Sequence, residues 1–214
     1  MLANNIANSS TTGFKADREF YSLYESELPL AQSQWTDFSQ GVLIPSGNPL
    51  DIALAGQGFI GLNSPTGTVY TRGGEFQISK SNQLQTADGY TIRNVNDQGK
   101  PITVDPLQAI EIDKDGVVRQ GGQEIGQMEI VSVDNAGSAL KKLGTTYFAL
   151  MNATPKAAPA TEVRQGAIEQ SNTPVADQAV KLVSVMRQFE MLQKAMLVGT
   201  DMNKESLDKV ASVG

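Results

Sequence analysis

The chain has 214 residues and a formal net charge of −6, and 40% of its residues are apolar. This length accommodates one substantial domain with appendages, and the apolar content is sufficient for a hydrophobic core. An acidic chain without a block of basic residues is a poor candidate for binding the phosphate backbone of nucleic acids. We therefore expect no nucleic-acid partner.

The sequence contains neither cysteine nor histidine. The lack of cysteine excludes disulfides, thiolate metal sites and cysteine nucleophiles. Histidine is the usual general base at neutral pH and the commonest metal ligand. We therefore predict that the chain is not an enzyme, and we expect no catalytic residues, no cofactor and no metal site.

The hydropathy of the chain argues against a membrane protein. No apolar run reaches the length of about 18 residues that suggests a transmembrane helix. The segment Met1–Ser10 lacks the basic and apolar regions of a cleaved signal peptide. We therefore expect no membrane insertion, and export of this protein would need a route that does not use a cleaved signal.

Residues 1–40 are predicted to form the end of a helix followed by an arm. Leu2 and Ile6 lie on one helical face, and Gly13 is a plausible stop for that helix. From Asp17 to Phe38, aromatic residues are scattered without a clear period. This segment is predicted to be an extended or irregular arm that needs a partner surface.

Residues 41–165 contain turn dipeptides, such as Asp88-Gly89 and Asp115-Gly116, about every 8–12 residues. Short runs of β-prone residues lie between these turns. The runs are Leu50–Leu54, Thr68–Thr71, Gln83–Thr86, Ile110–Ile112, Val117–Arg119, Met128–Val133 and Thr146–Leu150. This rhythm predicts a mainly β middle domain, built as a meander, a sandwich or a barrel.

Residues 166–214 are predicted to form a long helix. Thr173 can cap its start and Pro174 suits its first turn, so we expect the helix from about Pro174 to Val210. An apolar stripe follows at helical spacing and consists of Leu182, Met186, Phe189, Met196, Leu207 and Val210, with polar interruptions at Gln193, Thr200 and Asn203. Such a long amphipathic helix favours coiled-coil-type packing against partners.

Two ligand-binding motifs occur in the β region, and each has a better structural explanation. Gly56–Gly61 matches the dinucleotide fingerprint, but turn-forming residues follow it instead of the required helix. The segment Glu111-x-Asp113-x-Asp115-Gly116 resembles the first half of a calcium loop, but its twelfth position, where the bidentate glutamate should be, is Gly122. We predict a glycine-rich strand and turn at the first motif, and a hairpin turn at Asp115-Gly116.

Several segments, in order along the chain, resemble the rod and hook proteins of the bacterial flagellum. They are Ala3–Asn8, Thr11–Lys15, Gly47–Ala53, Gly56–Phe59, Tyr70–Phe76, Leu84–Tyr90 and Gln170–Val175, followed by the long final helix. The resemblance covers nearly the whole chain, and its motifs are specific when taken together. Within that family, Arg187–Met191 is more similar to the proximal rod type than to the distal rod or hook subunits, which are the alternatives.

The resemblance implies a β domain flanked by terminal helices that pair with one another and with neighbouring subunits. It also implies a structural role in the basal-body rod, self-assembly or assembly with other rod and hook-type axial proteins, and type III export without a cleaved signal. In the family a longer helix precedes the Ala3–Asn8 block, so we expect the native chain to start upstream of Met1. The expected subunit-interface residues are Asn4, Asn5, Asn8, Gly13, Phe14, Leu182, Met186, Phe189, Met196 and Leu207.

Two other classes of protein remain open at this stage. A secreted β-domain binding module with a trimeric coiled-coil stalk would need uninterrupted apolar heptads, which the polar residues of the stripe break. A glycan hydrolase would need two carboxyl groups that face one another across a cleft.

Overall fold

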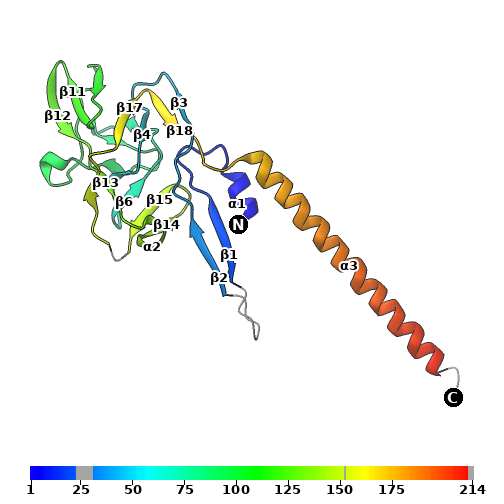
Figure 1. Cartoon of the computed structure of the whole chain (residues 1–214). Coiled ribbons are helices and arrows are strands. Elements are labelled where there is room, and N and C mark those ends of the chain that lie inside the picture. Colours follow the sequence, from blue (N-terminus) through cyan, green and yellow to red (C-terminus); the bar gives the residue numbers. More distant parts are fainter. Residues whose placement is uncertain (23–30, 152, 212–214) are drawn as a thin grey trace.

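The chain consists of a body of short antiparallel strands, from which a β-hairpin and a long helix project in different directions (Figure 1). The computed structural model describes residues 1–22, 31–151 and 153–211, with side chains described except at residues 19–22, 31–33 and 205–211. The N-terminus lies near the base of the long helix, whose other end is remote from the body.

The largest sheet contains nine antiparallel strands. Seven of them form one path in the order β14 (Leu140–Leu143), β15 (Tyr147–Leu150), β6 (Gly67–Thr71), β5 (Phe59–Ser64), β9 (Thr91–Ile92), β8 (Leu84–Gln85) and β7 (Gln77–Ile78). The other two are β13 (Ile130–Ser132), which pairs with β5, and β16 (Lys156–Ala157), which pairs with β13. The strand β5 begins directly after Gly58, so the predicted strand and turn at Gly56–Gly61 are confirmed.

Smaller sheets complete the body. They comprise β10 (Ile110–Ile112), β11 (Val117–Gln120) and β12 (Gln123–Gln127) in one sheet, β4 (Ile52–Ala55) with β17 (Glu162–Gln165), and β3 (Leu43–Pro45) with β18 (Ala167–Glu169). Two short helical segments lie between strands, η1 (Val95–Asp97) and α2 (Ala136–Ala139). The predicted hairpin turn at Asp115-Gly116 is confirmed, because the Gly116 amide donates to the Asp113 carbonyl between β10 and β11.

Two apolar clusters hold the body together. The main cluster lies between the sheets and includes Ile60, Leu62, Ile92 and Ile102, all fully buried. Complete burial of one such side chain stabilises the fold by about 1.5–3 kcal/mol. The second cluster surrounds Phe148, and its aromatic rings are packed edge to face. In this cluster the Phe38 ring centroid lies 5.1 Å from that of Phe148 and 5.5 Å from that of Phe59.

The N-terminal segment differs from the sequence prediction at the end of its helix. Helix α1 (Leu2–Ala7) has Asn8 as its C-cap and ends well before Gly13, so Gly13 is not the residue that stops it. The segment predicted as an extended or irregular arm contains a β-hairpin of β1 (Asp17–Ser22) and β2 (Ala31–Thr36). Three aromatic residues of the predicted arm, Phe20, Tyr21 and Tyr24, have side chains that lie outside the described part of the structure.

Helix α3 (Val175–Ala211) has 37 residues and a length of about 55 Å. It starts one residue later than predicted, and the first helical hydrogen bond runs from the Gln178 amide to the Pro174 carbonyl. Thr173 does not cap the helix, since its buried hydroxyl has no hydrogen-bond partner among the described residues. None of the described helices combines the length and the hydropathy that crossing a membrane requires.

These observations confirm a mostly β protein with a long C-terminal helix. The N-terminal helix α1 is short and contacts α3. Coiled-coil packing of α3 stays a prediction, because within the described chain α3 leaves the body as a single helix (Figure 1).

Candidate assembly surface

The apolar side chains of α3 are exposed to solvent over most of the helix. Phe189 is 61% exposed and Met196 is 72% exposed, and further exposed apolar residues extend to Met202. Exposed apolar surface of this extent marks a contact with another molecule in most soluble proteins. We therefore take α3 as the candidate assembly surface.

Many of the exposed apolar residues of α3 fall on two faces, and a charged strip separates these faces on one side of the helix. The first face carries Leu182, Met186, Phe189 and Met196, and the second carries Val180, Met191, Val198 and Met202. The charged strip carries Arg187, Glu190, Lys194 and Asp201 at helical spacing. A helix with one apolar face can be covered by a single partner, whereas α3 offers apolar surface on two sides.

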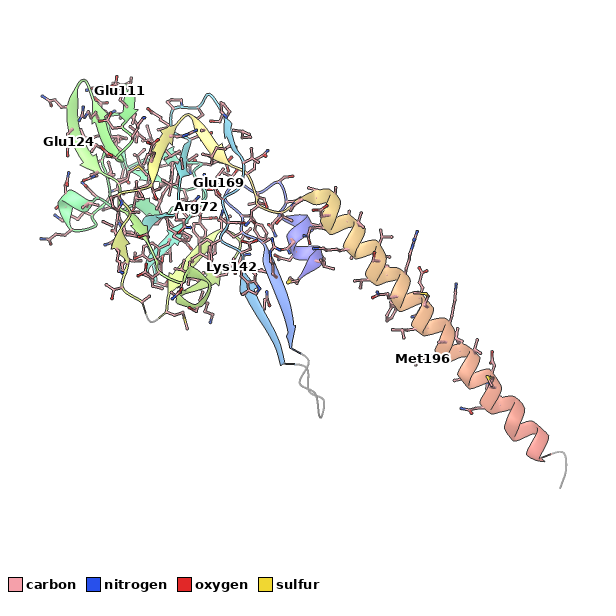
Figure 2. All side chains as sticks on the ribbon, viewed as in Figure 1. Arg72, Glu111, Glu124, Lys142, Glu169 and Met196 are labelled. Atoms are coloured by element: carbon pink, nitrogen blue, oxygen red, sulfur yellow. The ribbon has the colours of Figure 1, made fainter. Side chains whose placement is uncertain are left out.

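A buried ionic cluster lies where the terminal segments join the body, and we call it the Glu169 cluster (Lys15, Arg72 and Glu169). The Lys15 ammonium lies 2.6 Å from Glu169 Oε1, and the Arg72 guanidinium lies 2.7 Å from Glu169 Oε2. Figure 2 shows Arg72 and Glu169 side by side at the centre of this junction. All three side chains are buried, so the cluster carries a net charge of +1 inside the protein.

Each charged group of the Glu169 cluster makes more than one hydrogen bond. Glu169 Oε1 also accepts a bond from the Gly41 amide, and Oε2 accepts a second bond from Arg72 Nε. The Arg72 guanidinium donates further to the carbonyls of Gly56 and Gly58 at 2.8 and 2.7 Å, and Lys15 donates to the Ser39 carbonyl. Burial lowers the pKa of Lys15, against the opposing attraction of Glu169.

Two glycines allow the backbones at this junction to approach closely. A Cβ atom on Gly13, which has a φ of +69°, would lie 2.3 Å from the Gly73 nitrogen. A Cβ atom on Gly41 would lie 1.9 Å from the Gln170 carbonyl oxygen. Only glycine fits at either position without a shift of the backbone.

Side-chain amides connect the same segments. Asn172 Oδ1 accepts from the Ala16 amide at 2.8 Å, and Asn172 Nδ2 donates to the Asp37 carbonyl at 2.7 Å. Asn5 bonds both backbone groups of Asp17, so it fastens α1 to the first residue of β1. These bonds leave the N-terminal segment and the chain before α3 attached to each other as well as to the body.

The predicted interface residues therefore separate into two groups. Asn5, Gly13 and Phe14 are buried within the chain and belong to the junction, with no side-chain surface left for a neighbouring subunit. Asn4 is exposed on α1, and Asn8 bonds locally to the Asn4 carbonyl and to Thr11. Among the stripe residues, Leu182 is half-buried, the next three are exposed, and the side chain of Leu207 lies outside the described residues.

Three junction residues were assigned no role from the sequence, namely Arg72, Lys142 and Glu169. The Lys142 ammonium lies 4.0 Å from the centroid of the buried Phe14 ring and bonds the Lys15 carbonyl. Arg72 stands in a motif that was noticed, and Glu169 directly precedes another. The pairing of two charged residues that are 97 positions apart leaves no signal in a single sequence.

The described residues contain no group of three or more acidic, cysteine or histidine side chains that could hold a metal ion. A groove of about 940 Å³ lies between the base of the hairpin and the body, with Trp35, Phe38 and Phe59 in its lining. Its lining includes one carboxylate, Asp134, which is exposed and paired with Lys156. A glycan hydrolase would need a second carboxyl group in such a groove.

Three family models match the chain. They are described as the flagellar hook protein FlgE/F/G D1 domain, matching residues 53–120, the flagellar basal body rod FlgEFG protein C-terminal, matching residues 164–208, and the flagella basal body rod protein, matching residues 1–15. Together these matches include each member of the Glu169 cluster and most of α3.

Curated relatives match over nearly the whole chain. The flagellar basal-body rod protein FlgF of Caulobacter vibrioides is 27% identical over 227 residues, which cover 100% of this chain and 91% of the relative. The flagellar basal-body rod protein FlgG of Agrobacterium fabrum is 30% identical over 241 residues, which cover 94% of this chain and 89% of the relative. Relatives of both names match at similar identity, and the proximal rod type stays a prediction.

Proposed function

The chain belongs to the family of flagellar basal-body rod proteins and is a structural subunit of the basal-body rod, and we propose that α3 is the surface through which it polymerises. The observation that carries this proposal is the uncovered apolar surface of α3. In a filament of stacked subunits, heterologous contacts repeat along the axis, so one surface of this kind serves every copy.

The energetics of α3 support assembly through this helix. An isolated helix is marginally stable in water, and most helical stability in proteins comes from the packing of an apolar face. Within the described chain, contacts from α1 reach only the first turns of α3, near Gln178 and Lys181. Neighbouring subunits that cover the rest would stabilise the helix and bury the side chains around Phe189 and Met196.

The two apolar faces of α3 favour more than one neighbour. A partner on the Phe189 face leaves Met191 and Val198 exposed on the other, and a second partner would cover them. Coiled-coil-type contacts with helices of adjacent subunits satisfy both faces. We propose that the partners are other copies of this chain and other rod and hook-type axial proteins.

The remaining parts of the proposal follow from family membership. We propose a protein without enzymatic activity, of the proximal rod type, which the flagellar export apparatus carries without a cleaved signal. We also propose that residues 41–165 form the main folded domain, and that residues 1–40 and 166–214 serve in assembly. A distal rod or hook subunit stays the alternative.

Crosslinking of single-cysteine variants tests this proposal, because the natural chain has no cysteine. We expect Met186→Cys carrying a benzophenone maleimide, which reacts with any side chain next to it, to form photocrosslinks to neighbouring subunits in isolated basal bodies, and to form none between dilute subunits. The matched control is Lys100→Cys, at an exposed position of the body. Equal crosslinking of the two variants in basal bodies would exclude α3 as the specific contact.

A further inference from the structure

The Glu169 cluster joins three segments that are far apart along the chain. Lys15 lies between α1 and β1, Arg72 follows β6 in the body, and Glu169 is the last residue of β18, just before the linker to α3. The covalent connection between the body and α3 is that linker alone, which spans residues 170–174. A helix attached in this way would sample many directions unless further contacts held it.

The contacts of the cluster place α1 beside the first turns of α3. The Glu169 carbonyl accepts a hydrogen bond from the Gly13 amide, and the Glu169 carboxylate binds Lys15. Strand β18 is therefore bonded to the N-terminal segment at two points. Helix α1 lies on the same segment, and Gln178 of α3 is buried although the following turns of the helix are exposed. Figure 1 shows α1 next to the first turns of α3.

The composition of the cluster argues that its main contribution is geometric. Removing two cations and one carboxylate from water is costly, and apolar replacements of buried ion pairs are often equally stable or more stable. Hydrogen bonds from several segments to both oxygens of one carboxylate, by contrast, restrict the relative orientation of the segments that carry the donors: Arg72 bonds Oε2 through two nitrogens, while Lys15 and the Gly41 amide bond Oε1. Glu169 receives four such donor contacts, from Lys15, from Gly41 and twice from Arg72, at 2.6 to 2.9 Å.

We propose that the Glu169 cluster is a positioning element that fixes the direction in which α3 leaves the β body. It does so by bonding the N-terminal segment to β18, which holds α1 in contact with the first turns of α3. This inference rests on the proposed function, because a fixed helix direction lets every subunit present α3 to its neighbours in the same way. It goes beyond that function in assigning the role to three buried residues that contact no partner.

The distance between two spin labels measures the direction of α3 directly. Labels are attached at Glu124→Cys on β12 and Arg187→Cys on α3, both exposed positions in a chain without other cysteines. For the parent chain we expect a single narrow distance distribution. The informative variant is Lys15→Met, which removes the Lys15–Glu169 ion pair but leaves the neutral Arg72–Glu169 pair in place.

We expect Lys15→Met to widen the distance distribution about twofold or more, because the N-terminal segment then loses its side-chain contact with Glu169 and α1 is held against α3 by fewer bonds. The melting midpoint of the β body should stay unchanged. Glu169→Gln should widen the distribution at least as much. Two matched controls should leave the width unchanged: Lys100→Met removes an exposed lysine, and Glu129→Gln breaks the Arg93–Glu129 pair within the body.

Three results would overturn the proposal. The first is a Lys15→Met distribution as narrow as that of the parent chain, and the second is a parent distribution that is already broad. The third is a fall in the melting midpoint of the Lys15→Met body, which would make the cluster a stability element of the core. The measurement uses the isolated chain, so it can fail while crosslinking in basal bodies succeeds, and the reverse also holds.

Discussion

Phe189→Asp is the substitution that separates assembly from folding most directly. Phe189 lies at the middle of the first apolar face of α3, one turn after Met186 and two turns before Met196. Phenylalanine and aspartate have similar helix propensities, and the Phe189 side chain is 61% exposed in the single chain. The isolated subunit should therefore lose only a few tenths of a kcal/mol, and the melting midpoint of its β body should be unchanged.

The expected loss in assembly is much larger. Complete burial of a phenylalanine side chain contributes about 1.5–3 kcal/mol, so covering the exposed 61% contributes about 1–2 kcal/mol per subunit. That difference weakens each contact about 5- to 30-fold. A carboxylate buried without a partner adds a further cost, and the loss recurs at every copy in the rod.

The assay is motility and rod completion in cells that lack the native gene and express the variant. The matched control is Val183→Asp, which introduces the same charge at an exposed position next to Arg187 and Glu190 in the charged strip. We expect swimming and complete rods with the control and neither with Phe189→Asp. A motile Phe189→Asp strain whose subunit melts several degrees lower would show that α3 packs on its own domain.

Three further predictions concern the body. Gly74→Ala places a Cβ atom 1.6 Å from the Ile52 carbonyl oxygen, so it should cost about 3 kcal/mol and lower the melting midpoint by roughly 6–12 °C. The control Gly137→Ala, which has open space around its Cβ, should leave the midpoint unchanged or slightly raised. Equal midpoints for the two variants would refute the steric argument. Burial and a hydrogen bond to Asp88 raise the pKa of Tyr147 from 10.0 to about 12, so its contribution to stability is present below pH 10 and is lost as the pH rises towards 12. Tyr147→Phe should flatten this alkaline decline in urea unfolding, and a decline as steep as in the parent would contradict it. Millimolar calcium or NAD should not move the melting midpoint, because Asp113 pairs with Arg119 and Gly56–Gly61 leads into a strand; a dose-dependent rise would show a ligand site.

Local patterns in the sequence predicted several of the elements. Each β-prone run overlaps a strand, as at Ile110–Ile112, and the Asp115-Gly116 turn and the long helix from Val175 were also found. Such patterns depend on residues that are neighbours along the chain: alternation sets a strand, and a glycine with positive φ sets a turn. The arm was predicted less well, because pairing of β1 with β2 is decided by contacts between strands and not by either strand alone.

The sequence by itself also determined which classes of chemistry are excluded, since a chain without histidine and cysteine lacks the commonest catalytic and metal-binding groups. Its motifs pointed to the family, but they did not reveal what the motif residues do. Only the tertiary structure decided that Asn5 and Phe14 are internal and that Lys15, Arg72 and Glu169 form one buried cluster. The physical reason is that a buried charge takes its partner from whichever segment the fold brings within about 3 Å, and here the partner of Lys15 is 154 residues away.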